Sequence, residues 1–174
     1  MECGTADLFG DCWPVEVSED MQRALIGVIG ASRCSPAGYD LAREIGQRIA
    51  RGGAAVVCGG LLGVMEAACR GCREAGGEAV GILPGGDAAD ANPYVTLAIP
   101  TNMGHARNMI IAHTSRVLIV VEGRLGTLSE IAIGLKLGRP VIALQKWPDI
   151  EGVIHVGSAE EAVARAFTFL SSRD

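Results

Sequence analysis

A glycine-containing turn, Glu122–Gly126, joins a short aliphatic run to a segment with helical apolar spacing. The run, 117–121, is bounded by turn residues and predicts a strand buried on both faces. The segment after it begins at Thr127 and ends near Gly138, a residue typical of helix C-termini. The first backbone N–H groups of a helix have no internal partner and carry partial positive charge. The turn is therefore a candidate anion site, with phosphate the expected guest.

Thr127 and Glu130 also have the spacing of a capping box. In that motif the Thr127 side chain caps the helix, and the Glu130 carboxylate accepts a hydrogen bond from the Thr127 backbone. On spacing alone this structural role is the better interpretation, because the motif recurs in unrelated helices. The alternative is that Glu130 presents a carboxylate to the anion site, together with Glu66 from the first turn of an earlier helix.

Three arginines, Arg33, Arg107 and Arg124, lie in or near glycine-containing turns. A guanidinium group is planar and binds phosphate or carboxylate through paired hydrogen bonds. Each arginine taken alone is better interpreted as a solvated loop residue, but their joint placement favours an anion site. His105 is a further candidate for contact with a ligand, although a lone histidine at a helix start is more often a cap or a surface residue.

Aliphatic runs alternate with helical patterns along residues 23–174. Consecutive strand–helix units predict a parallel sheet with right-handed crossovers. We therefore expect an α/β fold, a single doubly wound domain with a mostly parallel sheet of about seven strands and helices on both faces. Residues 1–22 show no clear period and are expected to be an extension, on the surface or disordered. The expected strands are 24–29, 54–58, 78–83, 95–99, 117–121, 141–144 and 152–156, and the expected helices are 37–51, 64–74, 102–113, 127–138 and 158–170.

The turns after four of these strands should share one edge of the sheet, because ligands bind beyond the carboxyl ends of parallel strands. These turns are 30–35, 59–63, 84–86 and 122–126. The first lacks the G-x-G-x-x-G pattern, and no acidic residue ends the second strand to hold a ribose. A standard NAD site is therefore not expected.

The composition excludes several classes of function. A net charge of −5 argues against nucleic acid as a partner, because binding its phosphates needs a basic face. No run is long enough to span a membrane, and residues 1–20 do not have the pattern of a signal peptide. We therefore expect a cytoplasmic protein whose six cysteines are reduced.

Cys69 and Cys72 have the spacing of a redox pair or half a zinc site. They lie inside an expected helix, and no second pair follows at zinc-like spacing. We interpret them as packing residues and expect no metal site.

A set of motifs occurs along the chain: Gly59-Gly60 with Gly63-Val64-Met65-Glu66-Ala67, Glu74-Ala75-Gly76-Gly77, Gly81-Ile82-Leu83-Pro84, Arg107-Asn108 and Gly126-Thr127-Leu128-Ser129-Glu130. In combination they resemble the LOG-like family, once labelled lysine-decarboxylase-like, and in particular its branch of molybdenum-cofactor carrier proteins. The resemblance covers about residues 25–170, and the combination is specific although each motif alone is weak.

The resemblance implies a Rossmann-like fold, a homo-oligomer (dimer or tetramer) and loops that hold the phosphate of a small nucleotide-like ligand. By this resemblance the protein requires no cofactor, and its bound ligand is expected to be molybdenum cofactor or a nucleotide. The enzymes of the family are phosphoribohydrolases, which cleave the N-glycosidic bond of nucleoside 5′-monophosphates, and Arg107 and Glu130 match their catalytic arginine and glutamate. The candidate ligand-binding residues are Gly30, Ser32, Arg33, Gly59, Gly60, Gly63, Met65, Glu66, Arg107, Asn108, Gly123, Arg124, Gly126 and Thr127.

Four positions depart from the pattern of the hydrolases. Their phosphate loop reads Pro-Gly-Gly-x-Gly-Thr, whereas here Glu122 replaces the proline and Arg124 the second glycine. Arg124 therefore either fills the pocket or adds a cation for an extra phosphate. Asn108 stands where the hydrolases carry lysine, which resembles the carrier branch. Leu62 replaces a frequent glycine and is expected to narrow the second loop.

Three functions follow as hypotheses. The first is a carrier or binding protein for a phosphorylated nucleotide-like ligand, with molybdenum cofactor as a candidate. The second is a nucleoside 5′-monophosphate phosphoribohydrolase, and the third a regulatory subunit whose site is blocked by Arg124. Lysine decarboxylation is not expected, because neither Lys136 nor Lys146 lies near the loops to bind pyridoxal phosphate.

Overall fold

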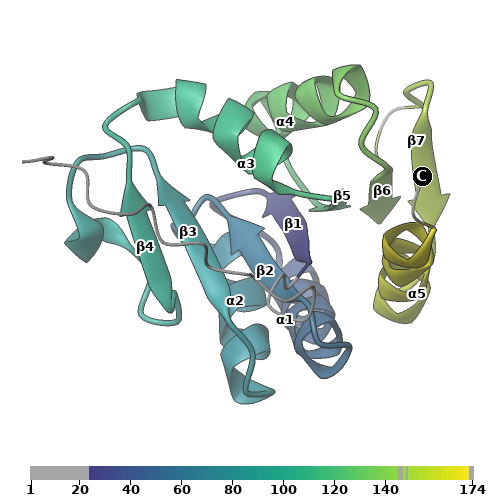
Figure 1. Cartoon of the computed structure of the whole chain (residues 1–174), viewed down its shortest axis with the longest axis horizontal. Helices are drawn as coiled ribbons and strands as arrows, with labels where there is room; N and C mark the ends of the chain where they lie inside the picture. The colour runs from purple at the N-terminus through teal and green to yellow at the C-terminus, as the bar shows by residue number, and fades with distance from the viewer. Residues whose placement is uncertain (1–23, 145–146, 148, 173–174) are drawn as a thin grey trace, which may run out of the picture.

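The computed structural model describes residues 24–144, 147 and 149–172 (Figure 1). The predicted N-terminal extension, residues 1–22, lies outside the described residues. The strands are β1 Leu25–Gly30, β2 Ala55–Cys58, β3 Ala79–Leu83, β4 Leu97–Pro100, β5 Val117–Val121, β6 Val141–Leu144 and β7 Val153–Val156. The helices are α1 Pro36–Arg51, α2 Val64–Glu74, α3 Asn108–Thr114, α4 Leu125–Lys136 and α5 Ala159–Ser171, with two short 3₁₀ helices, η2 Ala88–Asp90 and η3 Gly104–Arg107.

The strands form one seven-stranded sheet in the order β4-β3-β2-β1-β5-β6-β7. Every neighbouring pair is parallel. From β1 the chain moves outward through β2, β3 and β4, and then returns to the other side of β1 as β5. The strand order therefore reverses between β1 and β5, the position at which open parallel sheets bind ligands. The predicted α/β fold, doubly wound and Rossmann-like, is confirmed.

Helices cover both faces of this sheet (Figure 1). One apolar core packs α1, α2 and α5 against the sheet, and includes Ile45, Ala68 and Val163. A second core packs α3 and α4 against the opposite face, and includes Ile111 and Ile131. The β5 side chains are all buried, as expected for a central strand. Among the helices in the described ranges, none combines the length and the apolar character needed to cross a bilayer.

Side-chain caps explain where two of the helices begin. The Ser35 hydroxyl accepts a hydrogen bond from the Gly38 N–H at the start of α1, and Pro36 occupies the first helical position. The Ser158 hydroxyl accepts from the Glu161 N–H at the start of α5.

Two expected helices differ from the structure. The helix expected over 102–113 is instead the 3₁₀ turn η3 followed by α3, which begins at Asn108. The helix expected from Thr127 begins at Leu125, and its N-cap residue is Arg124. The other expected boundaries agree with the structure to within about two residues, the usual variation at element ends.

Candidate ligand-binding site

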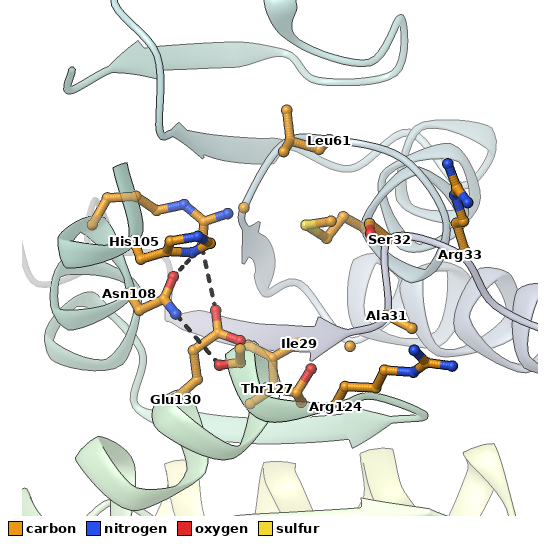
Figure 2. A pocket seen from close by; sticks show the side chains of 15 residues that line it. Ile29, Ala31, Ser32, Arg33, Leu61, His105, Asn108, Arg124, Thr127 and Glu130 are labelled. Atoms are coloured by element: carbon orange, nitrogen blue, oxygen red, sulfur yellow. Dashed lines mark hydrogen bonds and ion pairs between the residues drawn. The ribbon is translucent and has the colours of Figure 1, made fainter. Parts of the chain in front are cut away.

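A cavity of about 420 Å³ opens at the carboxyl edge of the sheet, where β1 and β5 lie side by side (Figure 2). Its walls come from the turns after β1, β2 and β5, from η3, and from the N-terminal parts of α2, α3 and α4. It is lined by most of the residues that the sequence singles out: Gly30, Ser32, Arg33, Gly59, Met65, Arg107, Asn108, Arg124, Gly126, Thr127 and Glu130. Segments distant in the sequence therefore converge on one site, as expected at a reversal of strand order.

Four candidate residues do not line the cavity: Gly60, Gly63, Glu66 and Gly123. The three glycines shape the turns. Gly60 and Gly63 have φ angles of 71° and 66°, a left-handed conformation that favours glycine. A Cβ at Gly123 would lie 2.3 Å from the Thr127 hydroxyl oxygen, so only glycine lets the turn close on α4. Glu66 lies in the first turn of α2, where its charge complements the helix dipole.

Arg107 and Glu130 form a nearly buried ion pair inside the cavity. Arg107 Nη1 lies 3.4 Å from Glu130 Oε1, and the two residues are 8% and 6% exposed. Arg107 Nη1 also donates to the side-chain oxygen of Asn108. Arg107 Nε is buried and has no hydrogen-bond partner among the described residues. An unpartnered buried donor is rare in folded proteins and indicates a missing acceptor at this position.

Burial shifts the pKa of both members of the pair. Desolvation raises the pKa of Glu130 to about 7, and the nearby Arg107 charge offsets this only in part. Desolvation also lowers the pKa of Arg107, against the opposing effect of Glu130. A carboxyl group that titrates near neutrality and faces a cavity is a candidate general acid or base.

The predicted capping box is wrong. Thr127 lies within the first turn of α4 rather than at its N-cap, and Glu130 pairs with Arg107 instead of the backbone. Arg124 occupies the N-cap, and no side chain of the described residues caps this helix end. The free N–H groups of α4 therefore keep their hydrogen-bonding capacity for a ligand in the cavity, which Gly126 and Thr127 line.

Asn108 connects the ion pair to the start of α4. Its side-chain nitrogen donates to the Ser129 hydroxyl at 2.9 Å, and that hydroxyl donates to the Gly126 carbonyl at 2.7 Å. Its side-chain oxygen accepts from Arg107. Both the nitrogen and the oxygen of the Asn108 side chain are therefore hydrogen-bonded, and Asn108 fixes the position of the Arg107 guanidinium relative to α4.

The turn after β2 leaves space for the guanidinium of Arg107. A Cβ at Gly59 would lie 2.3 Å from Arg107 Nη2, so a larger residue would displace the side chain. The Gly60 N–H donates to the Cys58 sulfur, which lies 3.4 Å from the Cys69 sulfur. Cys69 and Cys72 are buried in α2, as their interpretation as packing residues predicts.

Glu122 has a structural role that the sequence does not reveal. Its carboxylate accepts hydrogen bonds from the Ser35 backbone N–H, at 2.9 Å, and from the Ser35 hydroxyl. Its carbonyl oxygen accepts from the Ala31 N–H at 3.1 Å. Glu122 therefore ties the turn after β5 to the turn after β1 and holds these two walls of the cavity together.

The polar groups lie on two sides of the cavity (Figure 2). His105, Asn108 and Glu130 lie on one side, while Arg33 and Arg124 lie on the other. Arg124 is exposed and its guanidinium has no hydrogen bond or ion pair within the described ranges, so it does not fill the cavity as one sequence hypothesis required.

Sequence reasoning missed three lining residues, Ile29, Ala31 and Leu61. Leu62, which was expected to narrow the second turn, is instead 61% exposed and does not line the cavity. No sequence signal distinguishes the two leucines, because both follow the same glycine pair. Within residues 24–144, 147 and 149–172, no group of three or more His, Cys, Asp or Glu side chains is arranged to hold a metal ion.

Comparison with known proteins identifies relatives over most of the chain. The sequence model of the SLOG cluster4 family matches residues 23–168. An uncharacterised protein from Archaeoglobus fulgidus is 46% identical over 143 residues, which cover 82% of this chain and 94% of that protein.

Two solved structures share both fold and sequence. The molybdenum cofactor binding protein from the phototrophic bacterium Rippkaea orientalis superposes with a TM-score of 0.82 at 34% identity, covering 87% of this chain and 99% of that one. The molybdenum cofactor carrier protein from Chlamydomonas reinhardtii has a TM-score of 0.80 at 32% identity, covering 87% of this chain and all of its own. The chain therefore belongs to the SLOG cluster4 family, a LOG-like family, and is similar to molybdenum cofactor carrier proteins.

Proposed function

We propose that this protein binds or carries a small phosphorylated, nucleotide-like ligand, with molybdenum cofactor as the leading candidate. The observation that carries the proposal is the buried Arg107 Nε, which lacks an acceptor in a cavity next to the uncapped start of α4. A guanidinium and free helix N–H groups both favour anionic oxygen. The similarity to two proteins named for molybdenum cofactor supports the same ligand class.

A molybdenum-containing ligand would be held here through its organic and phosphate parts. The cavity offers Arg107, Asn108 and the α4 backbone to such groups, whereas the described residues form no metal-binding cluster. The residues present therefore fit the organic and phosphate parts of such a ligand.

Calorimetry of the full chain with AMP, GMP and a pterin phosphate tests this proposal. We expect saturable binding of at least one of them, and no binding of the unphosphorylated nucleoside or pterin. Mass spectrometry of the purified protein should detect a phosphorylated compound of the same class. Failure of every phosphorylated ligand to bind would refute the proposal.

A phosphoribohydrolase is the second candidate, because the Glu130 carboxyl titrates near neutrality inside the cavity. Such a group can orient water or stabilise a positively charged ribose-like transition state, while Arg107 stabilises negative charge. The variant Glu130→Gln separates the two functions. Release of free base by the wild type but not by a folded Glu130→Gln variant would establish catalysis, whereas binding without base release by the wild type supports the carrier.

A homo-oligomer, dimer or tetramer, remains our proposal for the assembled state. It is supported by apolar side chains exposed on the adjoining helices α3 and α4, namely Met109, Leu125 and Leu128. We retain the prediction that nucleic acid is not a partner, since the chain carries a net charge of −5.

A further inference from the structure

Two buried cysteine sulfurs lie in contact next to the cavity. Cys58 ends β2 and Cys69 lies in α2, and their sulfur atoms are 3.4 Å apart. Both residues are 0% exposed. They are not the pair whose spacing stands out in the sequence, because the Cys72 thiol donates to the Glu78 carbonyl at 3.1 Å. The fold therefore creates a thiol pair between a strand and a helix that the sequence spacing does not reveal.

The two thiols differ in acidity because their neighbours act on them in opposite directions. A hydrogen bond from Cys69 lowers the pKa of the Cys58 thiol, and the Gly60 N–H and the Arg107 charge lower it further, whereas desolvation raises it. The same hydrogen bond and burial raise the pKa of Cys69. Cys58 is therefore the nucleophile of the pair, and Cys69 is the thiol that keeps its proton.

The cavity brings small molecules close to this pair. Gly59 and Met65 line the cavity. Cys58 directly precedes Gly59, and the Cys58 sulfur lies 3.9 Å from the Met65 carbonyl oxygen. Because neither sulfur reaches the surface, a bulky oxidant such as oxidised glutathione cannot contact them in the folded protein. Hydrogen peroxide is close to water in size and needs only a small local displacement of this wall.

We propose that Cys58 and Cys69 are a reversible modification site, which hydrogen peroxide converts to a disulfide. In the first step the Cys58 thiolate attacks one peroxide oxygen, the O–O bond breaks, and the leaving hydroxide takes up the thiol proton to form water. The product is a sulfenic acid on Cys58. In the second step the Cys69 sulfur displaces the sulfenic hydroxyl group, which leaves as a second water with the Cys69 proton. The sulfurs lose two electrons, and the peroxide accepts them.

The disulfide changes one wall of the cavity. Bond formation brings the sulfurs from 3.4 Å to about 2.05 Å. A Cβ at Gly59, the residue after Cys58, would lie 2.3 Å from Arg107 Nη2, so this turn packs closely against the guanidinium. Oxidation therefore acts on the wall that contacts Arg107, whichever ligand the cavity binds.

The test is peroxide treatment of the folded full chain, followed by unfolding, alkylation of the remaining thiols and digestion with trypsin. Cleavage at the flanking arginines gives peptide 52–70, which contains Cys58, Cys69 and no other cysteine. The reduced peptide carries two alkyl groups. The disulfide form carries none and is lighter than the unmodified peptide by two hydrogen atoms. Met65 lies in the same peptide and gains an oxygen atom if peroxide oxidises it instead.

We expect hydrogen peroxide to convert most of peptide 52–70 to the disulfide form, and dithiothreitol to restore both alkylation sites. Oxidised glutathione should leave both sites free. Cys69→Ser should stop at the sulfenic acid on Cys58, which dimedone traps. Cys72→Ser is the matched control at another buried thiol of α2 and should form the disulfide as the wild type does.

Two alkyl groups on peptide 52–70 after peroxide treatment, with or without an oxygen atom on Met65, would overturn the inference. A disulfide that joins Cys58 or Cys69 to a different cysteine would overturn it as well. Both outcomes are measured on the wild type, so they decide the question even if a serine variant fails to fold.

Discussion

Arg107 Nη1 lies 3.4 Å from Glu130 Oε1 and both residues are more than nine-tenths buried, yet the pair is not a tight one. Charge-assisted hydrogen bonds between nitrogen and oxygen usually measure about 2.7–2.9 Å. Arg107 Nε has no hydrogen-bond partner among the described residues, and burial disfavours the charged form of Glu130 by raising its pKa. A buried pair with this much unused bonding capacity is suited to receiving a polar ligand rather than to stabilising the fold.

The pKa of Glu130 predicts how stability depends on pH. Burial raises this pKa from 4.5 to about 7, so the folded state favours the neutral carboxyl group. Its stabilising contribution is fully present below pH 4.5 and is lost as the pH rises through about 7. The shift corresponds to at most about 3 kcal/mol. In urea titrations, the free energy of unfolding of the wild type should fall between about pH 5 and pH 8, and that of Glu130→Gln should fall less.

The exposed residue Glu160 provides the control for this measurement. Glu160→Gln should keep the pH dependence of the wild type, because its carboxylate is largely solvated. Equal pH dependence in Glu130→Gln and the wild type would show that Glu130 is ionised throughout this range.

Arg107→Gln should weaken binding of a phosphorylated ligand by about 30- to 150-fold, the equivalent of about 2–3 kcal/mol for a buried charged hydrogen bond. At pH 7 its stability should change little, because Glu130 can take up a proton once its counter-ion is gone. Calorimetry measures the ligand affinity of the variant, and thermal unfolding measures its stability. Arg116→Gln, at the opposite edge of the sheet, should bind as the wild type does. Unaltered affinity in Arg107→Gln would exclude Arg107 from the ligand site.

Gly59→Ala should reduce ligand affinity about tenfold while the protein stays folded, because the new Cβ would lie 2.3 Å from Arg107 Nη2 and displace the guanidinium. Gly157→Ala is the matched control, since a Cβ there meets nothing within 4 Å. Affinity is measured by calorimetry and folding by circular dichroism. If both variants bind equally well, the contact between Gly59 and Arg107 does not position the guanidinium.

Glu122→Ala and Ser35→Ala should each destabilise the protein by about 1–2 kcal/mol. Glu122→Ala removes both side-chain hydrogen bonds to Ser35, whereas Ser35→Ala removes the one from its hydroxyl together with the N-cap of α1. The double variant should lose less than the sum of the two, with a coupling of about 1 kcal/mol. Urea unfolding of the wild type, the two single variants and the double variant gives the four free energies of unfolding that this double-mutant cycle needs. Strictly additive losses would mean that the two side chains do not interact in solution.

Light scattering after size exclusion should give the mass of a dimer or tetramer. Leu125 is 81% exposed, and placing charge there should shift the assembly toward monomer if α3 and α4 form the interface. Leu62→Glu, in the turn after β2, is the control at another exposed leucine and should leave the mass unchanged. A monomeric wild type would disprove the proposed assembly.

The fold and most of the cavity lining could be predicted because they follow from local patterns. Aliphatic runs such as Val117–Val121 alternate with helical segments, and parallel strands must bring their following turns to one edge. This places Arg33, Arg107 and Arg124 near one another without any knowledge of side-chain packing.

The errors arise where tertiary contacts override local rules. Thr127 has the residue type of a helix cap, but α4 starts earlier, with Arg124 at its N-cap and no side-chain cap. Glu130 finds its partner 23 residues away, and Glu122 finds Ser35 at a separation of 87 residues. Short-range spacing carries no information on contacts of that range.

A crystal structure of the full chain soaked with AMP would test the anion site most directly. We expect phosphate oxygens within hydrogen-bond distance of the backbone N–H groups of Gly126 and Thr127, and an acceptor atom of the ligand on Arg107 Nε. A ligand bound elsewhere on the protein, with the start of α4 solvated and Arg107 Nε still without a partner, would contradict the proposed site.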